Sequence, residues 1–121
     1  MRVLLADDDR VLSLLFATRL RALGWTVDVA YDAMQAVMFA MRSSPDVIVL
    51  DIQMPGGTGV EALRKLMAST KTSQIPVVIM TGSIDPQEAP RLHELGAREF
   101  LVKPVEVEAL HQTLTRITTG A

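Results

Sequence analysis

Residues 47–55 read VIVLDIQMP, an apolar run that ends in an aspartate. A short, continuous apolar run with β-branched residues is typical of a strand that is buried on both faces. Asp51 follows the run directly, and Pro55 comes four residues later. A carboxylate at the end of a buried strand needs a physical reason, because burying an ionised group without a partner is costly.

Similar apolar runs recur along the chain, and helical spacing fills the segments between them. Each intervening segment has apolar residues three or four positions apart, which is typical of an amphipathic helix. Strands that alternate with helices indicate a parallel sheet with helices on both faces. We therefore predict five strand–helix units, with strands at 3–6, 26–30, 46–50, 76–80 and 99–102.

Polar residues, glycines and prolines predict where the helices begin and end. Asp9 is predicted to cap a helix over 10–23 that places Leu12, Phe16, Leu20 and Leu23 on one face, and Asp32 is predicted to cap a helix that runs to 42. Further helices are predicted at 58–68, up to 95, and after Pro104. Pro90 falls within the fourth helix, where an interior proline would remove a backbone hydrogen bond. We expect that helix to be kinked or to begin late, near Ala89.

The composition restricts the class of protein. A length of 121 residues favours one domain over 1–121, and the net charge of −2 without a basic cluster argues against direct nucleic-acid binding. The chain has no cysteine, which excludes disulfides and thiolate metal sites. Its apolar runs are too short to span a bilayer, and no secretory signal is recognised. We expect a cytoplasmic protein without membrane insertion.

Polar side chains follow the predicted strands where each strand ends. Asp7 and Asp8 follow the first strand, Asp51 the third and Thr81 the fourth, while Lys103 ends the fifth. In open parallel sheets, ligands bind beyond the carboxyl ends of the strands. These residues are therefore expected to meet at one edge of the sheet.

The types of side chain at this edge favour phosphoryl chemistry with a hard metal ion. Clustered carboxylates repel one another unless a cation lies among them, and an all-oxygen ligand set favours Mg²⁺. A lysine is a natural partner for a phosphoryl group, and a carboxylate can itself be the nucleophile in phosphoryl transfer. Asp51 stands alone at its strand end and is the best candidate for that role.

Four motifs together resemble the receiver domain of two-component response regulators, of the chemotaxis-regulator-like kind. They are LLADDDR at 4–10, DVIVLDIQMPGGTG at 46–59, VVIMTG at 77–82 and FLVKP at 100–104. The resemblance covers essentially the whole chain. It implies a doubly wound, five-stranded parallel sheet of the flavodoxin-like (βα)5 type, with strand order 2-1-3-4-5.

The resemblance also implies roles for individual residues. Asp51 would accept a phosphoryl group from a histidine kinase or a phosphotransfer protein. Asp8 and Asp51 would bind Mg²⁺ directly, together with the backbone carbonyl of Gln53, and Asp7 would act through water. Gln53 and Ser83 would influence the lifetime of the phosphoryl group.

Further implied roles concern the switch between signalling states. Thr81 and Lys103 would hold the phosphoryl oxygens, and Phe100 would swing inward as Thr81 moves toward the phosphoryl group. The Lys103–Pro104 bond is often cis in this family. A partner or output domain would read the state at the face of the fourth helix, fifth strand and fifth helix. Val11 and Leu14 would be kinase-docking candidates.

The same residues also admit alternative functions. The leading interpretation is a signalling module that speeds loss of its own phosphoryl group with Mg²⁺ but is not an enzyme for a separate substrate. The alternative is a protein-binding platform of the same fold that is not phosphorylated. A haloacid-dehalogenase-like phosphatase would need an aspartate at Gln53, and a flavodoxin-like FMN carrier would need a hydroxyl- and glycine-rich loop after the first strand.

One feature of the second predicted helix is not explained by the resemblance. Met34, Met38 and Met41 form an apolar stripe beside a second stripe that contains Val37 and Ala40. A helix cannot easily bury two such stripes against one sheet. Because methionines suit adaptable binding surfaces, we hypothesise a partner or self-association surface there.

Overall fold

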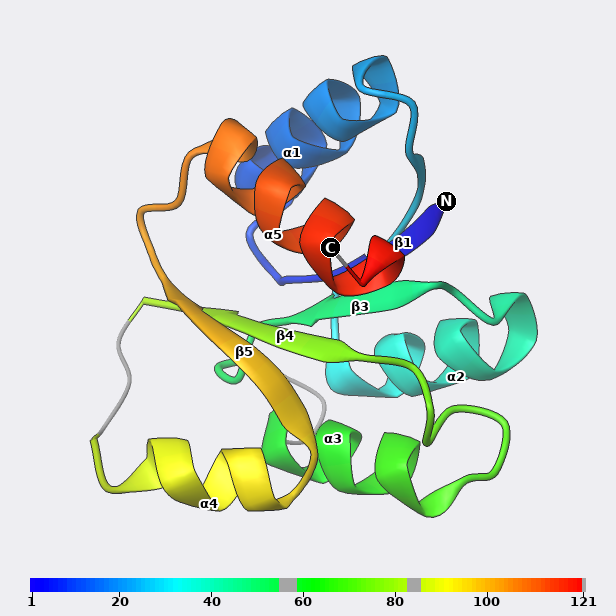
Figure 1. Cartoon of the computed structure of the whole chain (residues 1–121), viewed down its shortest axis with the longest axis vertical. Coiled ribbons are helices and arrows are strands. Elements are labelled where there is room, and N and C mark those ends of the chain that lie inside the picture. The colour runs from blue at the N-terminus through cyan, green and yellow to red at the C-terminus, as the bar shows by residue number, and fades with distance from the viewer. Residues whose placement is uncertain (55–58, 83–85, 121) are drawn as a thin grey trace.

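Five parallel strands form one sheet in the order β2-β1-β3-β4-β5, as predicted (Figure 1). The computed structural model describes residues 1–54, 59–82 and 86–120. In chain order the elements are β1 (Arg2–Ala6), α1 (Arg10–Ala22), β2 (Thr26–Ala30), α2 (Ala33–Ser43), β3 (Val47–Leu50), α3 (Gly59–Ala68), β4 (Val77–Thr81), α4 (Glu88–Glu94), β5 (Ala97–Val102) and α5 (Val107–Thr119).

Helices cover both faces of the sheet, which explains the continuous apolar strands. Helices α1 and α5 lie on one face, and α2, α3 and α4 lie on the other (Figure 1). Alternate residues of β3 contact opposite layers: Ile48 joins the cluster with α2 to α4, and Val49 joins the cluster with α1 and α5. All four residues of β3 have no exposed surface. Full burial of one such side chain stabilises the fold by about 1.5–3 kcal/mol.

The predicted helix caps at Asp9 and Asp32 are confirmed. The carboxylate of Asp9 accepts a hydrogen bond from the Leu12 amide at 3.0 Å, and that of Asp32 accepts one from the Gln35 amide at 2.7 Å. Each cap satisfies an amide that has no partner within its helix and stabilises the fold by about 1 kcal/mol. Helix α1 ends at Ala22, one residue before the predicted end, and Leu23 is 41% exposed, whereas Phe16 and Leu20 of the predicted face are buried.

Helix α4 begins late, as the position of Pro90 predicted. The helix begins at Glu88, so Pro90 is its third residue. Amides in the first turn have no acceptor within the helix, so a proline there removes no helical hydrogen bond. The result is a short helix of seven residues that carries the chain from the end of β4 toward β5.

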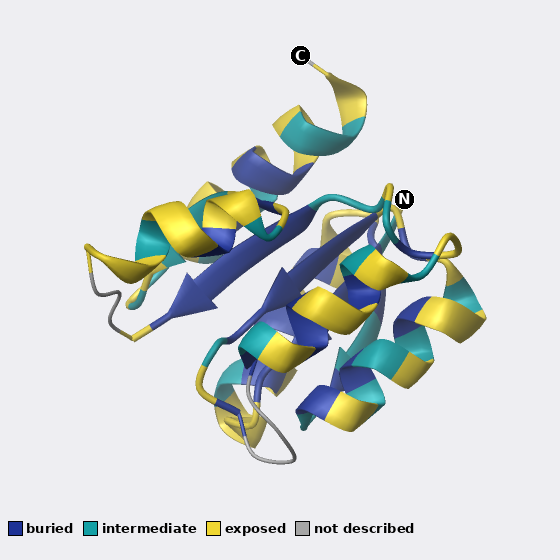
Figure 2. Cartoon of the chain, turned by 90° about the horizontal axis from the view of Figure 1, so that it is seen from below, coloured by how far each residue is buried: buried dark blue, intermediate teal, exposed yellow. Residues whose placement is uncertain are grey.

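Helix α2 packs through alanines and leaves its methionines in solvent. Ala36 and Ala40 have no exposed surface, whereas Met34 and Met38 are 69% and 51% exposed. Figure 2 shows the same division on the helices that flank the sheet, with buried segments toward the strands and exposed segments outward. A partner for the exposed methionines stays a hypothesis.

Among the described residues, no helix has the length and apolar character needed to cross a lipid bilayer.

Candidate functional site

Three charged side chains from different strand ends meet at the carboxyl edge of the sheet. Asp7 follows β1, Asp51 follows β3 and Lys103 follows β5. The Lys103 Nζ atom lies 2.7 Å from Asp7 Oδ2 and 3.1 Å from Asp51 Oδ2. Adjacent pairing of β1 and β3 aligns Ala6 with Leu50, which places the two aspartates side by side. The sequence prediction that these residues share one edge is confirmed.

Backbone amides hold both buried carboxylates in place. The Asp9 amide donates to Asp7 Oδ1 at 2.9 Å, and the Gln53 amide donates to Asp51 Oδ1 at 2.9 Å. Asp7 is 1% exposed and Asp51 is 5% exposed. A buried carboxylate that accepts hydrogen bonds and contacts a cation is tolerated, unlike an unpaired one. This answers why β3 ends in an aspartate: its partners are already in position.

Thr81 brings a hydroxyl group to the same edge. It ends β4 and is 2% exposed, and its Oγ1 atom has no hydrogen-bond partner among the described residues. An unsatisfied buried hydroxyl is unfavourable in the protein alone, so this atom fits a ligand that accepts a hydrogen bond. Phe100, on the neighbouring strand β5, is half-buried against the cluster of α2, α3 and α4.

Three carboxylates are close enough to hold one metal ion. Asp7, Asp8 and Asp51 each offer an oxygen, and these atoms lie within 4.8 Å of one another. Asp8 is exposed, so the cluster opens to solvent on one side. An oxygen-only ligand set with room for water fits Mg²⁺. The Gln53 carbonyl as a further ligand stays a prediction, and Ser83 lies outside the described residues.

The Lys103–Pro104 bond is cis, as the resemblance implied.

The surroundings of Asp51 and Lys103 shift their pKa values. Burial raises the pKa of Asp51, and the hydrogen bonds from Gln53 and Lys103 offset only part of that effect. Burial alone would favour neutral Lys103, but its hydrogen bonds to Asp7 and Asp51 outweigh this and raise the pKa of Lys103. Lys103 therefore stays charged, while the negative charge of Asp51 is disfavoured until a further cation arrives.

The raised pKa of Asp51 leads to a stability prediction for Asp51→Asn in metal-free buffer. Asp51 has one pKa in the folded state and a lower one in the unfolded state. At a pH above both values, the folded protein bears the full free-energy cost of the buried charge. As the pH falls through the folded-state pKa toward the ordinary value of 3.8, folded Asp51 binds a proton first and that cost disappears. Urea unfolding should therefore find Asp51→Asn more stable than the wild type at pH 7, with the difference narrowing toward pH 4. A variant that is less stable at every pH would contradict this prediction.

Gly59 is a structural requirement of the site that the sequence analysis missed. It begins α3, and its amide donates to the Ile52 carbonyl at 3.0 Å. A Cβ atom at this position would lie 2.5 Å from Ile52 Cα and 2.7 Å from the Asp51 carbonyl oxygen. Only glycine lets α3 approach the segment after Asp51 so closely. No local pattern in the sequence signals such a long-range contact.

Replacing Gly59 by alanine is expected to destabilise the fold by about 1–3 kcal/mol, the usual cost of overpacking. Gly82→Ala is the matched control, because a Cβ there meets no atom within 4 Å. Urea unfolding of both variants measures the difference. Equal stability of the two variants would show that the loop after Asp51 yields without cost.

Comparisons with known proteins agree with this geometry. A family model described as the response regulator receiver domain matches residues 3–115. PilH of Pseudomonas aeruginosa is 34% identical over 119 residues, which make up 98% of this chain and 98% of that protein. A gliding motility regulatory protein of Myxococcus xanthus is 33% identical over 119 residues, and the match covers 98% of this chain but only 15% of that longer protein.

Solved structures are similar over nearly the whole chain. The chemotaxis protein CheY4 of Vibrio cholerae superposes with a TM-score of 0.90 at 29% identity, covering 96% of this chain and 97% of that chain. The receiver domain of the sensor histidine kinase PA1611 of Pseudomonas aeruginosa has a TM-score of 0.88 at 27% identity, covering 98% and 97%. That structure has a magnesium ion coordinated in its active-site cleft.

Proposed function

Because this chain belongs to the response regulator receiver domain family, whose general function is to accept a phosphoryl group, we propose that Asp51 is the acceptor. The contact of Lys103 with both Asp51 and Asp7 carries this proposal. This contact places the Asp51 carboxylate next to the positive charge of Lys103, at the edge of the sheet that faces solvent. Phosphoryl transfer depends mainly on such positioning and charge neutralisation.

The transfer step forms one bond and breaks another. A carboxylate oxygen of Asp51 forms a new P–O bond while the P–N bond of a phosphohistidine donor breaks. The donor imidazole departs with the electron pair and regains a proton from solvent. With acetyl phosphate as donor, a P–O bond breaks instead and acetate leaves. The product in both cases is an aspartyl phosphate.

Lys103 and Thr81 are the groups that would hold the transferred oxygens. The Lys103 ammonium can exchange one carboxylate contact for a phosphoryl oxygen, and the Thr81 hydroxyl can donate to another. Thr81 supports this role because its Oγ1 atom has no partner among the described residues. Movement of Thr81 toward the ligand would leave space that Phe100 can enter from its half-buried position, and this is the proposed switch.

The donor set fits Mg²⁺ as the cofactor. Asp8, Asp51 and the Gln53 carbonyl would bind it directly, and Asp7 would act through water. Bound there, the ion would neutralise negative charge on the phosphoryl oxygens.

The proposal describes a signalling module and not an enzyme with a separate substrate. Residues 1–121 would act as one receiver domain in the cytoplasm, a compartment consistent with the absence of cysteine. A histidine kinase or phosphotransfer protein would supply the phosphoryl group, and hydrolysis at Asp51 with Mg²⁺ would remove it. A downstream protein or output domain would read the state at the face of α4, β5 and α5.

The proposal is tested by offering the wild-type protein acetyl phosphate with and without Mg²⁺. Intact-mass spectrometry is expected to find one phosphoryl adduct that requires Mg²⁺. Borohydride reduces an aspartyl phosphate to homoserine, so peptide mapping after reduction should find homoserine at position 51. Homoserine at another aspartate would refute Asp51 as the acceptor. No adduct under any condition would favour the unphosphorylated binding platform.

A further inference from the structure

Strand β2 lies at the edge of the sheet and has no neighbouring strand on one side. It is the first strand in the order and pairs with β1. The Thr26 amide donates to the Met1 carbonyl, and the Ala30 carbonyl accepts from the Asp7 amide, so both residues face β1. Backbone groups of a strand alternate between its two sides. The amides and carbonyls of Val27 and Val29 therefore point away from the sheet.

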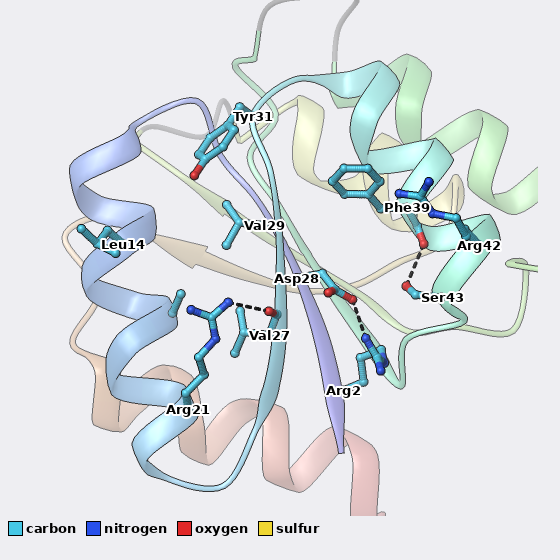
Figure 3. Close-up of a pocket in the computed structure, with 11 residues that line it drawn as sticks. Arg2, Leu14, Arg21, Val27, Asp28, Val29, Tyr31, Phe39, Arg42 and Ser43 are labelled. Atoms are coloured by element: carbon cyan, nitrogen blue, oxygen red, sulfur yellow. Dashed lines mark hydrogen bonds and ion pairs between the residues drawn. The ribbon is translucent and has the colours of Figure 1, made fainter.

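A groove of about 410 Å³ runs along this free edge, between α1 and α2 (Figure 3). Its two walls differ because side chains of β2 alternate between the faces of the sheet. Val27 and Val29 pack with the α1 layer, and Leu14 of α1 extends that apolar wall. The opposite wall carries Phe39 and Arg42 of α2. The α1 side of the groove is thus mainly apolar, with Arg21 at one end, and the α2 side is mainly polar (Figure 3).

The groove carries an excess of positive charge. Its lining includes three arginines and a single carboxylate, that of Asp28, which pairs with Arg2 at 2.8 Å. Arg21 donates to the Val27 carbonyl at 2.8 Å (Figure 3), so an added strand would have to replace this side chain as the donor to that carbonyl. The Arg42 guanidinium lies 5.0 Å from the Phe39 ring centroid and is exposed. Three positive charges against one negative give a local excess of two in a chain whose net charge is −2.

We propose that the β2 edge binds an extended acidic segment of a partner protein, which pairs with Val27 and Val29 as an added strand. Main-chain hydrogen bonds to a free edge supply affinity in this mode, and side-chain pockets supply specificity. Apolar residues of the segment face Val27, Val29 and Leu14, and its alternate acidic residues face Arg42. A second copy of this chain is the wrong occupant, because it would bring two sets of arginines together.

The first experiment titrates the ¹⁵N-labelled full chain with a capped hexapeptide in which glutamate alternates with valine. The amide signals of Val27 and Val29 are expected to shift, and their hydrogen exchange is expected to slow. A peptide with lysine in place of glutamate should cause neither change, and added salt should weaken binding of the acidic peptide. No shifts at millimolar acidic peptide, or equal shifts with the lysine peptide, would overturn the proposal.

A second experiment tests the α2 side of the groove with matched charge reversals. Arg42→Glu is expected to weaken binding of the acidic peptide by roughly tenfold. Arg98→Glu makes the same change of charge at an exposed position of β5, at the opposite edge of the sheet, and should leave binding unchanged. Equal weakening by both variants would indicate non-specific attraction and refute the groove. The unchanged remainder of the spectrum verifies that each variant is folded.

Inorganic phosphate separates strand docking from simple anion binding. Phosphate carries negative charge and can accept hydrogen bonds, but it lacks the alternating amides and carbonyls that pair along a strand. It should shift signals near Arg42 at most and should not slow exchange of the Val27 and Val29 amides. Slowed exchange with phosphate alone would overturn the docking of a strand.

Discussion

Asp51→Asn is expected to take up no phosphoryl group from acetyl phosphate at any Mg²⁺ concentration. A carboxamide lacks the anionic oxygen that must form the new P–O bond. The backbone around it should persist, because the asparagine oxygen can still accept from the Gln53 amide as Asp51 Oδ1 does at 2.9 Å. Lys103 would keep its 2.7 Å contact with Asp7. Intact-mass spectrometry measures the loss directly, as the adduct found in the wild type disappears.

Asp8→Asn is the control that separates loss of the acceptor from loss of a metal ligand. Asp8 belongs to the carboxylate cluster but is exposed, and it receives no contact from Lys103. This variant should still form the adduct, but only at a higher Mg²⁺ concentration. A urea-unfolding midpoint for Asp51→Asn at or above that of the wild type would verify that the variant is folded. An adduct on folded Asp51→Asn would place the acceptor elsewhere.

The residues that meet at the site were predictable from the sequence because each ends a strand. A parallel sheet aligns the carboxyl ends of its strands, so the residues that follow Ala6, Leu50 and Met80 had to approach one edge. The caps at Asp9 and Asp32 were predictable for a related reason, since capping depends on a few neighbouring residues. Predictions of this kind require only the local pattern and one rule of topology.

Other features depend on contacts between distant segments, and the sequence did not reveal them. The missing side chain of Gly59 matters because α3 approaches the segment after Asp51. His111 of α5 accepts a hydrogen bond at 2.9 Å from the indole of Trp25, which lies 86 positions earlier in the chain. The groove at β2 likewise arises only when Arg2, Arg21 and Arg42 meet from three elements. Periodicity indicates which face of an element is buried but not what lies opposite.

The order of the strands determines the positions of both the site at Asp51 and the groove at β2. The same topology that brings Asp7 beside Asp51 also places β2 at the free edge, because β1 lies between β2 and β3. The site uses the carboxyl ends of the central strands, whereas the groove uses the length of the outermost strand. A partner at the groove could therefore bind without covering Asp51.

Lys103→Met is expected to slow phosphoryl uptake by about 10²–10³-fold, the usual cost of removing one group that stabilises transition-state charge. Methionine keeps an unbranched side chain of similar length, so the change removes the ammonium with little loss of packing. The 2.7 Å and 3.1 Å contacts with Asp7 and Asp51 are lost together. Two adjacent carboxylates then lack their cation, and the pKa of Asp51 rises further. The initial rate of adduct formation at fixed acetyl phosphate and Mg²⁺ measures the effect.

Lys103→Arg tests whether charge alone is sufficient at this position. Arginine restores the positive charge, but its planar guanidinium cannot occupy the position of a compact ammonium between two carboxylates. Its rate of uptake should therefore lie between those of the wild type and Lys103→Met. A wild-type rate for Lys103→Met would show that Lys103 only holds the carboxylates in the resting state. A rate for Lys103→Arg as low as that for Lys103→Met would instead mean that the position of the charge, set by β5 and Pro104, matters more than its sign.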